Sequence, residues 1–166
     1  MRAHQDDPPF LLTCHPDTLA LYQYWRKKAG DRLMPRRSDL DPTEISPRLL
    51  PGITLVDVVE DDRRYVYRLV GTADVQVRGL DPTGKSVIDG FFGPTAENAL
   101  QCYDKVVATK APFLDPVPFT ASNGRYATEE TIFLPLSEDG VTVNKIIVFF
   151  AFRDVFDPAA EASTTA

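Results

Sequence analysis

Residues 64–84 read RYVYRLVGTADVQVRGLDPTG, and the fold can be worked out from this stretch. Large apolar side chains alternate along its first part, at Tyr65, Tyr67 and Leu69. This period of two is typical of a strand that is buried on one face. Gly71 then interrupts the strand, Thr72 can cap a short helix, and Gly79 ends that helix. The pattern predicts a chain that folds back over its own sheet.

The elements around this stretch follow from apolar periodicity and from turn residues. A helix is predicted from Pro16 to a C-cap at Gly30, and a capping box over 41–44 predicts a short second helix. The remaining predicted elements are strands over 53–59 and 64–70, a short helix over 72–79, a long helix over 94–110, and strands over 113–121, 125–136 and 141–152. Short connections make the last three strands antiparallel neighbours.

The length and composition predict one domain. A chain of 166 residues with 43% hydrophobic residues can bury one sizeable core. We expect a flexible N-terminal segment over 1–15, the first helix and an extended or short-helical lead-in over 16–52, the sheet domain over 53–156, and a flexible tail over 157–166.

The charge balance argues against two classes of partner. Lys and Arg number 18 against 24 Asp and Glu, which gives a formal charge of −6. Sequence-independent electrostatic binding to nucleic acid or to an anionic membrane is therefore not expected. The longest apolar run, 146–152, is too short to span a bilayer, and the N-terminus lacks the pattern of a signal peptide, so we expect a cytoplasmic protein.

The last predicted strand is apolar on both sides. Ile146, Val148, Phe150 and Phe152 alternate with Ile147, Phe149 and Ala151. Both faces of the sheet must then be covered. The first helix, with Leu19, Tyr22 and Trp25, can cover the second face, and so can a second protomer, so a homodimer is a hypothesis.

Several motifs in this order resemble a known family. They are RYVYRLVGT over 64–72, GLDPTGKSV over 79–87, LMPRRSDLDP over 33–42 with the following apolar positions to Val58, and LPLS over 134–137 with Asp139 and Gly140. Over residues 19–152 the chain resembles PAS domains, and more closely a bacterial single-domain PAS-like family. The resemblance implies an α+β fold, with a five-stranded antiparallel sheet and short helices over one face. It also implies a cavity and a role in sensing or signalling by ligand binding or protein contact.

A small organic ligand is the cavity content that we expect, with signalling through a protein partner or a second copy and no effector of its own. The residues predicted to line the cavity are Tyr67, Leu69, Tyr103, Val107, Tyr126, Thr128, Glu130 and Ile132. The alternative is that most of them fill the core, which would make the chain a ligand-free interaction adaptor.

Glu130 is the sharpest single candidate. The alternation along 125–136 places it on one face with Thr128 and Ile132, and a buried carboxylate needs a partner. Arg68, Arg125 or a polar group of the ligand can serve, or a bulge can turn Glu130 out to water.

The common PAS cofactors leave residue signatures that this chain lacks. Both histidines, His4 and His15, precede the core, which disfavours a histidine-ligated haem. Residues 100–103 do not match the Asn-Cys-Arg-Phe run of related photoactive flavin sites. Two distant cysteines, Cys14 and Cys102, cannot hold an iron–sulfur cluster in its usual form, and we predict no metal site.

We predict no catalytic residues, because neither histidine sits in a motif that would orient it as a base. Residues 79–86 do match the G-x-x-x-x-G-K-S pattern of a phosphate loop. The preceding segment looks helical, the following one is short, and Pro82 removes one amide from the cradle. Nucleotide binding through 79–86 is therefore kept as an alternative function only.

Overall fold

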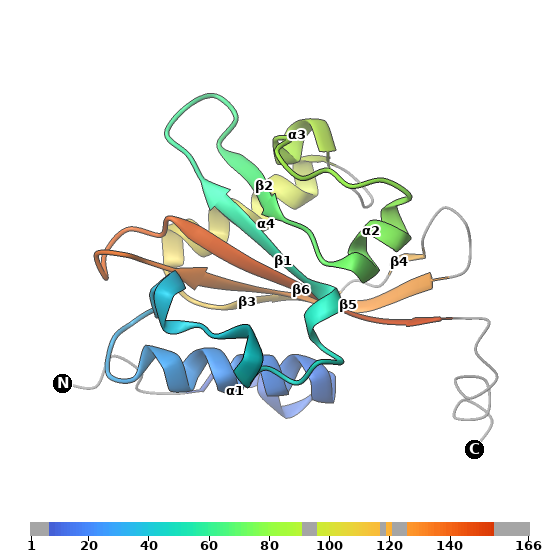
Figure 1. Cartoon of the computed structure of the whole chain (residues 1–166). Coiled ribbons are helices and arrows are strands. Elements are labelled where there is room, and N and C mark those ends of the chain that lie inside the picture. The colour runs from blue at the N-terminus through green and yellow to red at the C-terminus, as the bar shows by residue number, and fades with distance from the viewer. Residues whose placement is uncertain (1–6, 91–95, 117–118, 121–125, 155–166) are drawn as a thin grey trace, which may run out of the picture.

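The computed structural model describes residues 7–90, 96–116, 119–120 and 126–154, and Figure 1 shows an antiparallel sheet between two layers of helices. The strands are β1 Ile53–Val58, β2 Tyr65–Leu69, β3 Phe113–Asp115, β4 Phe119–Thr120, β5 Tyr126–Leu136 and β6 Lys145–Asp154. The helices are η1 Pro9–Leu12, α1 Pro16–Ala29, η2 Arg37–Asp39, η3 Pro42–Glu44, η4 Leu50–Gly52, α2 Thr72–Arg78, α3 Val87–Gly90 and α4 Ala96–Thr109.

The sheet has the predicted five positions. Five strands follow one another in the order β2-β1-β6-β5-β3, and β4 pairs with β5 as well. The third predicted strand, 113–121, is thus divided into β3 and β4, in a segment that contains Pro116 and Pro118. The last strand begins at Lys145 rather than at residue 141, because Asp139 accepts the amides of Val141 and Thr142 in a longer turn. The α+β fold class is confirmed.

The first helix forms where it was predicted. Pro16 occupies the first turn, Nδ1 of the preceding His15 accepts the amide of Asp17 at 3.0 Å, and Gly30 ends α1 with φ +60°. The buried face of α1, which includes Leu21 and Trp25, covers β5 and β6. A layer of this chain therefore covers the second face of the sheet.

The lead-in, residues 30–52, crosses the same face beside α1 (Figure 1). Its predicted capping box is only half formed. The Asp41 side chain accepts the amide of Thr43 at 2.9 Å, but Glu44 pairs with Lys28 and the Asp41 amide donates to the Tyr24 hydroxyl. One 3₁₀ turn forms there, and its side chains tie the lead-in to α1.

The middle helices α2, α3 and α4 lie on the opposite face of the sheet (Figure 1). α2 begins at Thr72 with Gly71 as its N-cap and has no side-chain cap, so the predicted Thr72 cap is wrong. Gly71 is required by close approach, since a Cβ there would lie 2.2 Å from the Pro51 carbonyl oxygen. The start of α2 is thereby held against the beginning of β1.

Strand register assigns side chains to the two faces. Leu55, Ile147 and Leu134 are cross-strand partners, so they share the α1 face. Their neighbours Val56, Ile146 and Pro135 share the middle-helix face in the same way.

Two register shifts interrupt the alternation. Leu55 pairs with Leu69 and Val56 with Tyr67, so β2 has one extra residue at Arg68. Glu130 pairs with Ala151 and Thr128 with Phe152, so β5 has one extra residue at 129. Each extra residue is a β-bulge, which reverses the face to which the following side chains belong.

Candidate functional site

The face of the sheet under the middle helices is closed by aromatic side chains of the chain itself. The Tyr103 ring on α4 stacks on Tyr65 at 4.9 Å and meets Phe133 edge-on at 5.3 Å between centroids. All three side chains are buried, and Val106 beside them is fully buried. Burial raises the pKa of Tyr103 well above its usual value. This is a packed core among the described residues.

A buried polar network closes the α2 end of the same face. Arg78 pairs with Asp74 at 2.8 Å, with side chains 5% and 1% exposed, and Thr54 donates its hydroxyl to Asp74 at 2.7 Å. Arg78 also donates to the Gly90 carbonyl at 2.8 Å and to the Tyr67 hydroxyl at 3.3 Å. The charges are therefore satisfied within the protein, as buried charges must be.

The eight predicted cavity residues do not share one face. Tyr67 and Tyr103 are buried under the middle helices, and Val107 on α4 is partly buried against the core. Leu69 and Ile132 belong to the α1 face, because they pair in register with Leu55 and Phe149.

Glu130 also belongs to the α1 face, whereas the backbone positions of Tyr126 and Thr128 lie beyond the bulge. The expectation of a single shared face is wrong, because two bulges break the alternation on which it depended. A role for any of these eight residues in ligand contact stays a prediction.

Glu130 has a structural partner that the sequence did not suggest. Its two carboxylate oxygens accept the backbone amide of His15 at 3.0 and 3.1 Å. This amide lies at the start of α1, where a negative charge complements the free N–H groups and the helix dipole. Glu130 therefore fixes the N-terminus of α1 to β5.

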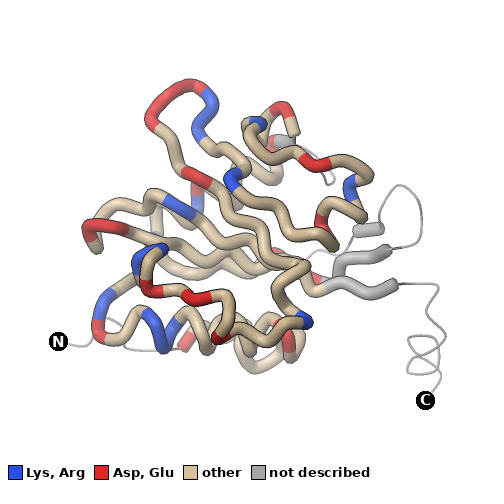
Figure 2. Tube along the Cα trace, in the orientation of Figure 1, with Lys and Arg blue, Asp and Glu red and all other residues tan. Residues whose placement is uncertain are grey.

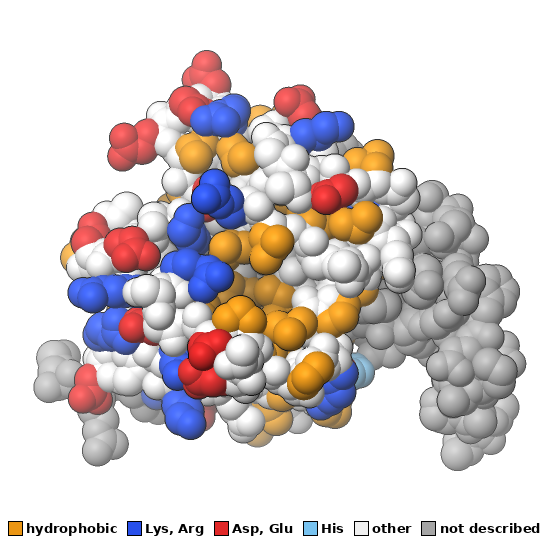
Figure 3. Space-filling model, in the orientation of Figure 1, with side chains coloured by type: hydrophobic (Ala, Val, Ile, Leu, Met, Phe, Trp, Pro, Cys, Tyr) orange, Lys and Arg blue, Asp and Glu red, His pale blue; other side chains and the backbone are white. Residues whose placement is uncertain are grey.

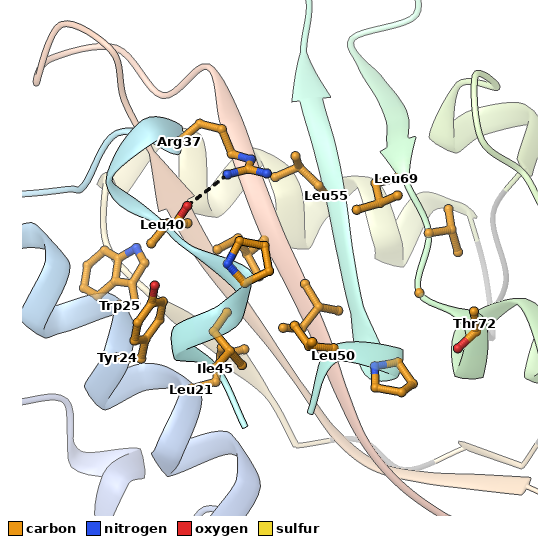
Figure 4. Close-up of a pocket in the computed structure, with 16 residues that line it drawn as sticks. Leu21, Tyr24, Trp25, Arg37, Leu40, Ile45, Leu50, Leu55, Leu69 and Thr72 are labelled. Atoms are coloured by element: carbon orange, nitrogen blue, oxygen red, sulfur yellow. Dashed lines mark hydrogen bonds between the residues drawn. The ribbon is translucent and has the colours of Figure 1, made fainter. Parts of the chain in front are cut away.

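The other face of the sheet contains an open apolar groove. Its volume is about 350 Å³, and it lies between α1, the lead-in and the β1–β2 side of the sheet (Figure 4). The groove is lined by Leu21, Tyr24, Trp25, Arg37, Leu40, Pro42, Ile45, Leu50, Pro51, Ile53, Leu55, Leu69, Val70, Gly71, Thr72 and Ile147. Hydrophobic side chains gather around a hollow in the middle of the face shown in Figure 3. Size and lining are typical of a small-molecule site.

The walls of the groove differ in how firmly they are held. On the α1 side, Trp25 is 1% exposed and its indole N–H donates to the Pro135 carbonyl at 2.9 Å. On the β2 side, Leu69 stands 56% exposed, turned to this face by the bulge at Arg68. The buried wall is fixed, and the exposed apolar wall has surface left to cover.

Side chains at the surface join the lead-in wall to α1. Lys28 pairs with Glu44 at 2.7 Å, and Tyr24 donates its hydroxyl to the Asp41 carbonyl at 3.1 Å. A second ion pair, between Arg32 and Asp39 at 2.8 Å, lies within the lead-in. Figure 2 shows acidic and basic positions interleaved along α1 and the lead-in. Exposed ion pairs contribute only about 0–1 kcal/mol each. The two ends of the lead-in are held more firmly, by the buried side chains of Met34 and Leu49.

Sequence reasoning missed the lead-in as part of a site. Leu40, Ile45 and Leu50 belong to the motifs that carry the family resemblance, but their spacing has no helical or strand period. The available signal was the concentration of apolar residues in a proline-rich segment, which needs a surface to pack against. Only the fold shows that this surface is the α1 face.

Residues 79–86 do not form a phosphate cradle. The amide of Thr83 donates to the Asp81 side chain at 3.0 Å, that of Gly84 to the Tyr67 carbonyl at 2.7 Å, and that of Lys85 to the Pro82 carbonyl at 2.9 Å. The segment instead continues the sheet beside β2, with a bridge between Val66 and Ser86. These amides are not free to converge on phosphate oxygens, which removes the basis for the nucleotide alternative.

Within the described ranges, no three His, Cys, Asp or Glu side chains lie close enough together to hold a metal ion. None of the helices in the described part of the chain combines the length and the apolar character needed to cross a bilayer.

Comparison with known proteins agrees with the fold. The PAS domain family model matches residues 13–149, which include α1, the lead-in and most of the sheet. None of the curated proteins matches this chain. The chain is similar to a sensory box sensor histidine kinase from Vibrio cholerae, with 16% identity, a TM-score of 0.48 and coverage of 64% of this chain and 85% of that one.

It is also similar to the PAS domain of Bordetella pertussis BvgS, with 16% identity, a TM-score of 0.41 and coverage of 75% and 94%. The light-state dimer of the fungal blue-light photoreceptor Vivid gives 12% identity, a TM-score of 0.48 and coverage of 89% and 99%. The family model spans well over half of the residues. The chain belongs to the PAS domain family.

Proposed function

We propose that this chain is a sensory PAS domain that binds a small, largely apolar molecule and signals through protein contacts, without catalysis of its own. The binding site in this proposal is the groove between α1, the lead-in and the sheet. The partner is a signalling protein or a second copy of the chain.

One observation supports the proposal above the others. The groove of about 350 Å³ is lined almost entirely by apolar side chains, whereas the middle-helix face is packed with buried aromatic rings. When a ligand covers apolar surface in a concave site, water is removed from that surface and the free energy of the system falls. A ligand therefore has a place to bind without displacing the core.

The attachment of the lead-in suggests how binding would be transmitted. A ligand in the groove touches the lead-in on one side and the sheet on the other, and the Lys28–Glu44 ion pair that joins the middle of the lead-in to α1 lies at the surface. Occupancy would change the position of the lead-in more readily than that of the sheet. The outer surface of α1 and the lead-in is thus the proposed contact surface for the partner.

Histidine-ligated haem and a photoactive flavin stay disfavoured in this proposal. The side chain of His15 serves as the N-cap of α1, and the Cys102 thiol is buried beside Asp115. Burial, with a further contribution from Asp115, raises the pKa of Cys102 to about 11, so the reactive thiolate is scarce at neutral pH.

The test is native mass spectrometry of freshly purified protein, compared with the denatured mass. Added mass that is lost on denaturation is expected for the wild type. Leu69→Trp, which fills the open wall of the groove, should lose it. Leu80→Trp is the matched control, because Leu80 is 53% exposed and does not line the groove. Loss of the ligand from both variants, or from neither, would contradict binding in the groove.

A second candidate function is a ligand-free interaction module. The filled middle-helix face favours it, because no cavity is needed there for the fold to be stable. In that case the groove would hold a side chain of a protein partner. The wild type would then show no bound mass, and Leu69→Trp would impair partner binding.

A further inference from the structure

We infer that the groove takes a single-chain carboxylate, with its hydrocarbon tail along the apolar walls and its carboxylate on Arg37. This rests on the proposed function, because it names the chemical class of the ligand for that same groove. The position of Arg37, the local charge and the shape of the walls support this inference.

Arg37 is the one charged side chain that lines the groove among the described residues. It is half-buried at one end of η2, and Figure 4 shows its guanidinium turned across the groove toward Leu55. One N–H donates to the Leu40 carbonyl at 3.3 Å, which is a long hydrogen bond. No ion pair occupies its other donors within the described residues. A guanidinium whose donors are not taken up by an ion pair can bind a carboxylate through two parallel N–H···O hydrogen bonds.

The charges around Arg37 select an anion of low charge. Two other basic residues of α1 and the lead-in, Lys28 and Arg32, are paired with Glu44 and Asp39, so they contribute little net attraction. The whole chain carries −6 and repels anions at long range. A single guanidinium can neutralise one negative charge, which favours a monoanion such as a carboxylate over a doubly charged phosphate ester.

The rest of the groove matches a hydrocarbon tail rather than a polar body. Away from Arg37, the walls are aliphatic and aromatic side chains such as Leu21, Ile45 and Leu69, with Thr72 as one of the few polar groups. Each methylene that enters such a site is expected to tighten binding about fourfold until the groove is full. Hexanoate, octanoate and decanoate therefore form a graded series of probes.

Intrinsic fluorescence gives a local readout of binding. The chain contains 1 tryptophan, and this residue, Trp25, lines the groove. Titrations with octanoate and with 1-octanol, below the concentrations at which they aggregate, compare an anionic and a neutral head group on the same tail. Arg37→Gln removes the charge at the groove. Arg36→Gln is the matched control, because Arg36 is exposed and does not line the groove.

We expect octanoate to bind the wild type, and Arg37→Gln to weaken octanoate binding about tenfold to a hundredfold with little effect on octanol. Arg36→Gln should leave both within about twofold of the wild type. The inference about Arg37 is overturned if Arg37→Gln does not weaken octanoate binding, or if Arg36→Gln weakens it equally. Binding of octanol without charge dependence would still leave the proposed groove in place. If neither probe changes Trp25 fluorescence, and neither binds by calorimetry, the inference of a single-chain ligand is overturned, and native mass spectrometry decides the proposed function separately.

Discussion

The two faces of the same sheet differ in how completely they are covered. Under α2, α3 and α4, aromatic rings stack at 4.9 and 5.3 Å and a buried ion pair has all its partners inside the protein. Under α1 and the lead-in, a groove of about 350 Å³ stays open and Leu69 stands 56% exposed at its wall.

The contrast shows how one β-strand can serve two purposes. Val56 and Ile146 are fully buried on the middle-helix face, and their neighbours Leu55 and Ile147 line the groove on the other. The α1 face is also closely packed along β5 and β6, where Trp25, Ile132 and Leu134 are at most 1% exposed. Its uncovered apolar surface lies at the groove beside β1 and β2, and binding resides at that groove in this account.

The strongest test of the closed face removes one half of its buried ion pair. Asp74→Ala leaves Arg78 buried without its carboxylate, and we expect a loss of about 3–5 kcal/mol in the free energy of unfolding, measured by urea denaturation. Asp61→Ala, which breaks an exposed pair with Arg63, should change stability little. Similar losses in both variants would contradict the assignment of the pair to a stabilising core.

Truncation of equal size on the two faces sharpens the comparison. Ile146→Ala removes methyl groups from a fully buried position on the closed face, and we expect a loss of about 3 kcal/mol. Leu69→Ala removes a similar volume from the open groove wall and should cost below about 1 kcal/mol. If both truncations cost the same in denaturant unfolding, the groove wall is packed in solution and the contrast between the faces disappears.

A smaller effect is expected from the thiol beneath the closed face. Burial and Asp115 raise the pKa of Cys102 in the folded state to about 11, from 9.0. A raised pKa means that the contribution of the protonated thiol to stability is fully present below about pH 9 and is lost as the pH rises through 11. The midpoint temperature of thermal unfolding should therefore fall more steeply over pH 9–11 in the wild type than in Cys102→Ala. Parallel pH profiles would show that the thiol is already solvated.

Much of the fold could be predicted from local pattern. The first helix is specified by Pro16, the apolar positions around Trp25 and the C-cap at Gly30, and it forms over Pro16–Ala29. The order of strands follows from turn residues and alternation, and the five-position antiparallel sheet confirms it. These features depend on neighbours in the sequence, which is why the sequence reveals them.

The candidate site could not be predicted, because it depends on two bulges and on a segment without a period. One extra residue at Arg68 places Leu69 on the groove face and Tyr67 on the other. Strict alternation had grouped them together, and the same break at residue 129 separates Thr128 from Glu130 in register. The Glu130 carboxylate accepts a hydrogen bond from the His15 amide, 115 positions away in the chain. No local sequence pattern predicts such a contact.

The most direct test of the central claim is a methyl NMR titration of the wild type with octanoate. Adjacent residues on opposite faces act as paired probes: Leu55 with Val56, and Ile147 with Ile146. The account predicts that the methyl signals of Leu55, Leu69 and Ile147 shift with saturation, while those of Val56, Val106 and Ile146 stay nearly unchanged. Saturable shifts confined to Val56, Val106 and Ile146 would place the ligand under the middle helices and contradict the account.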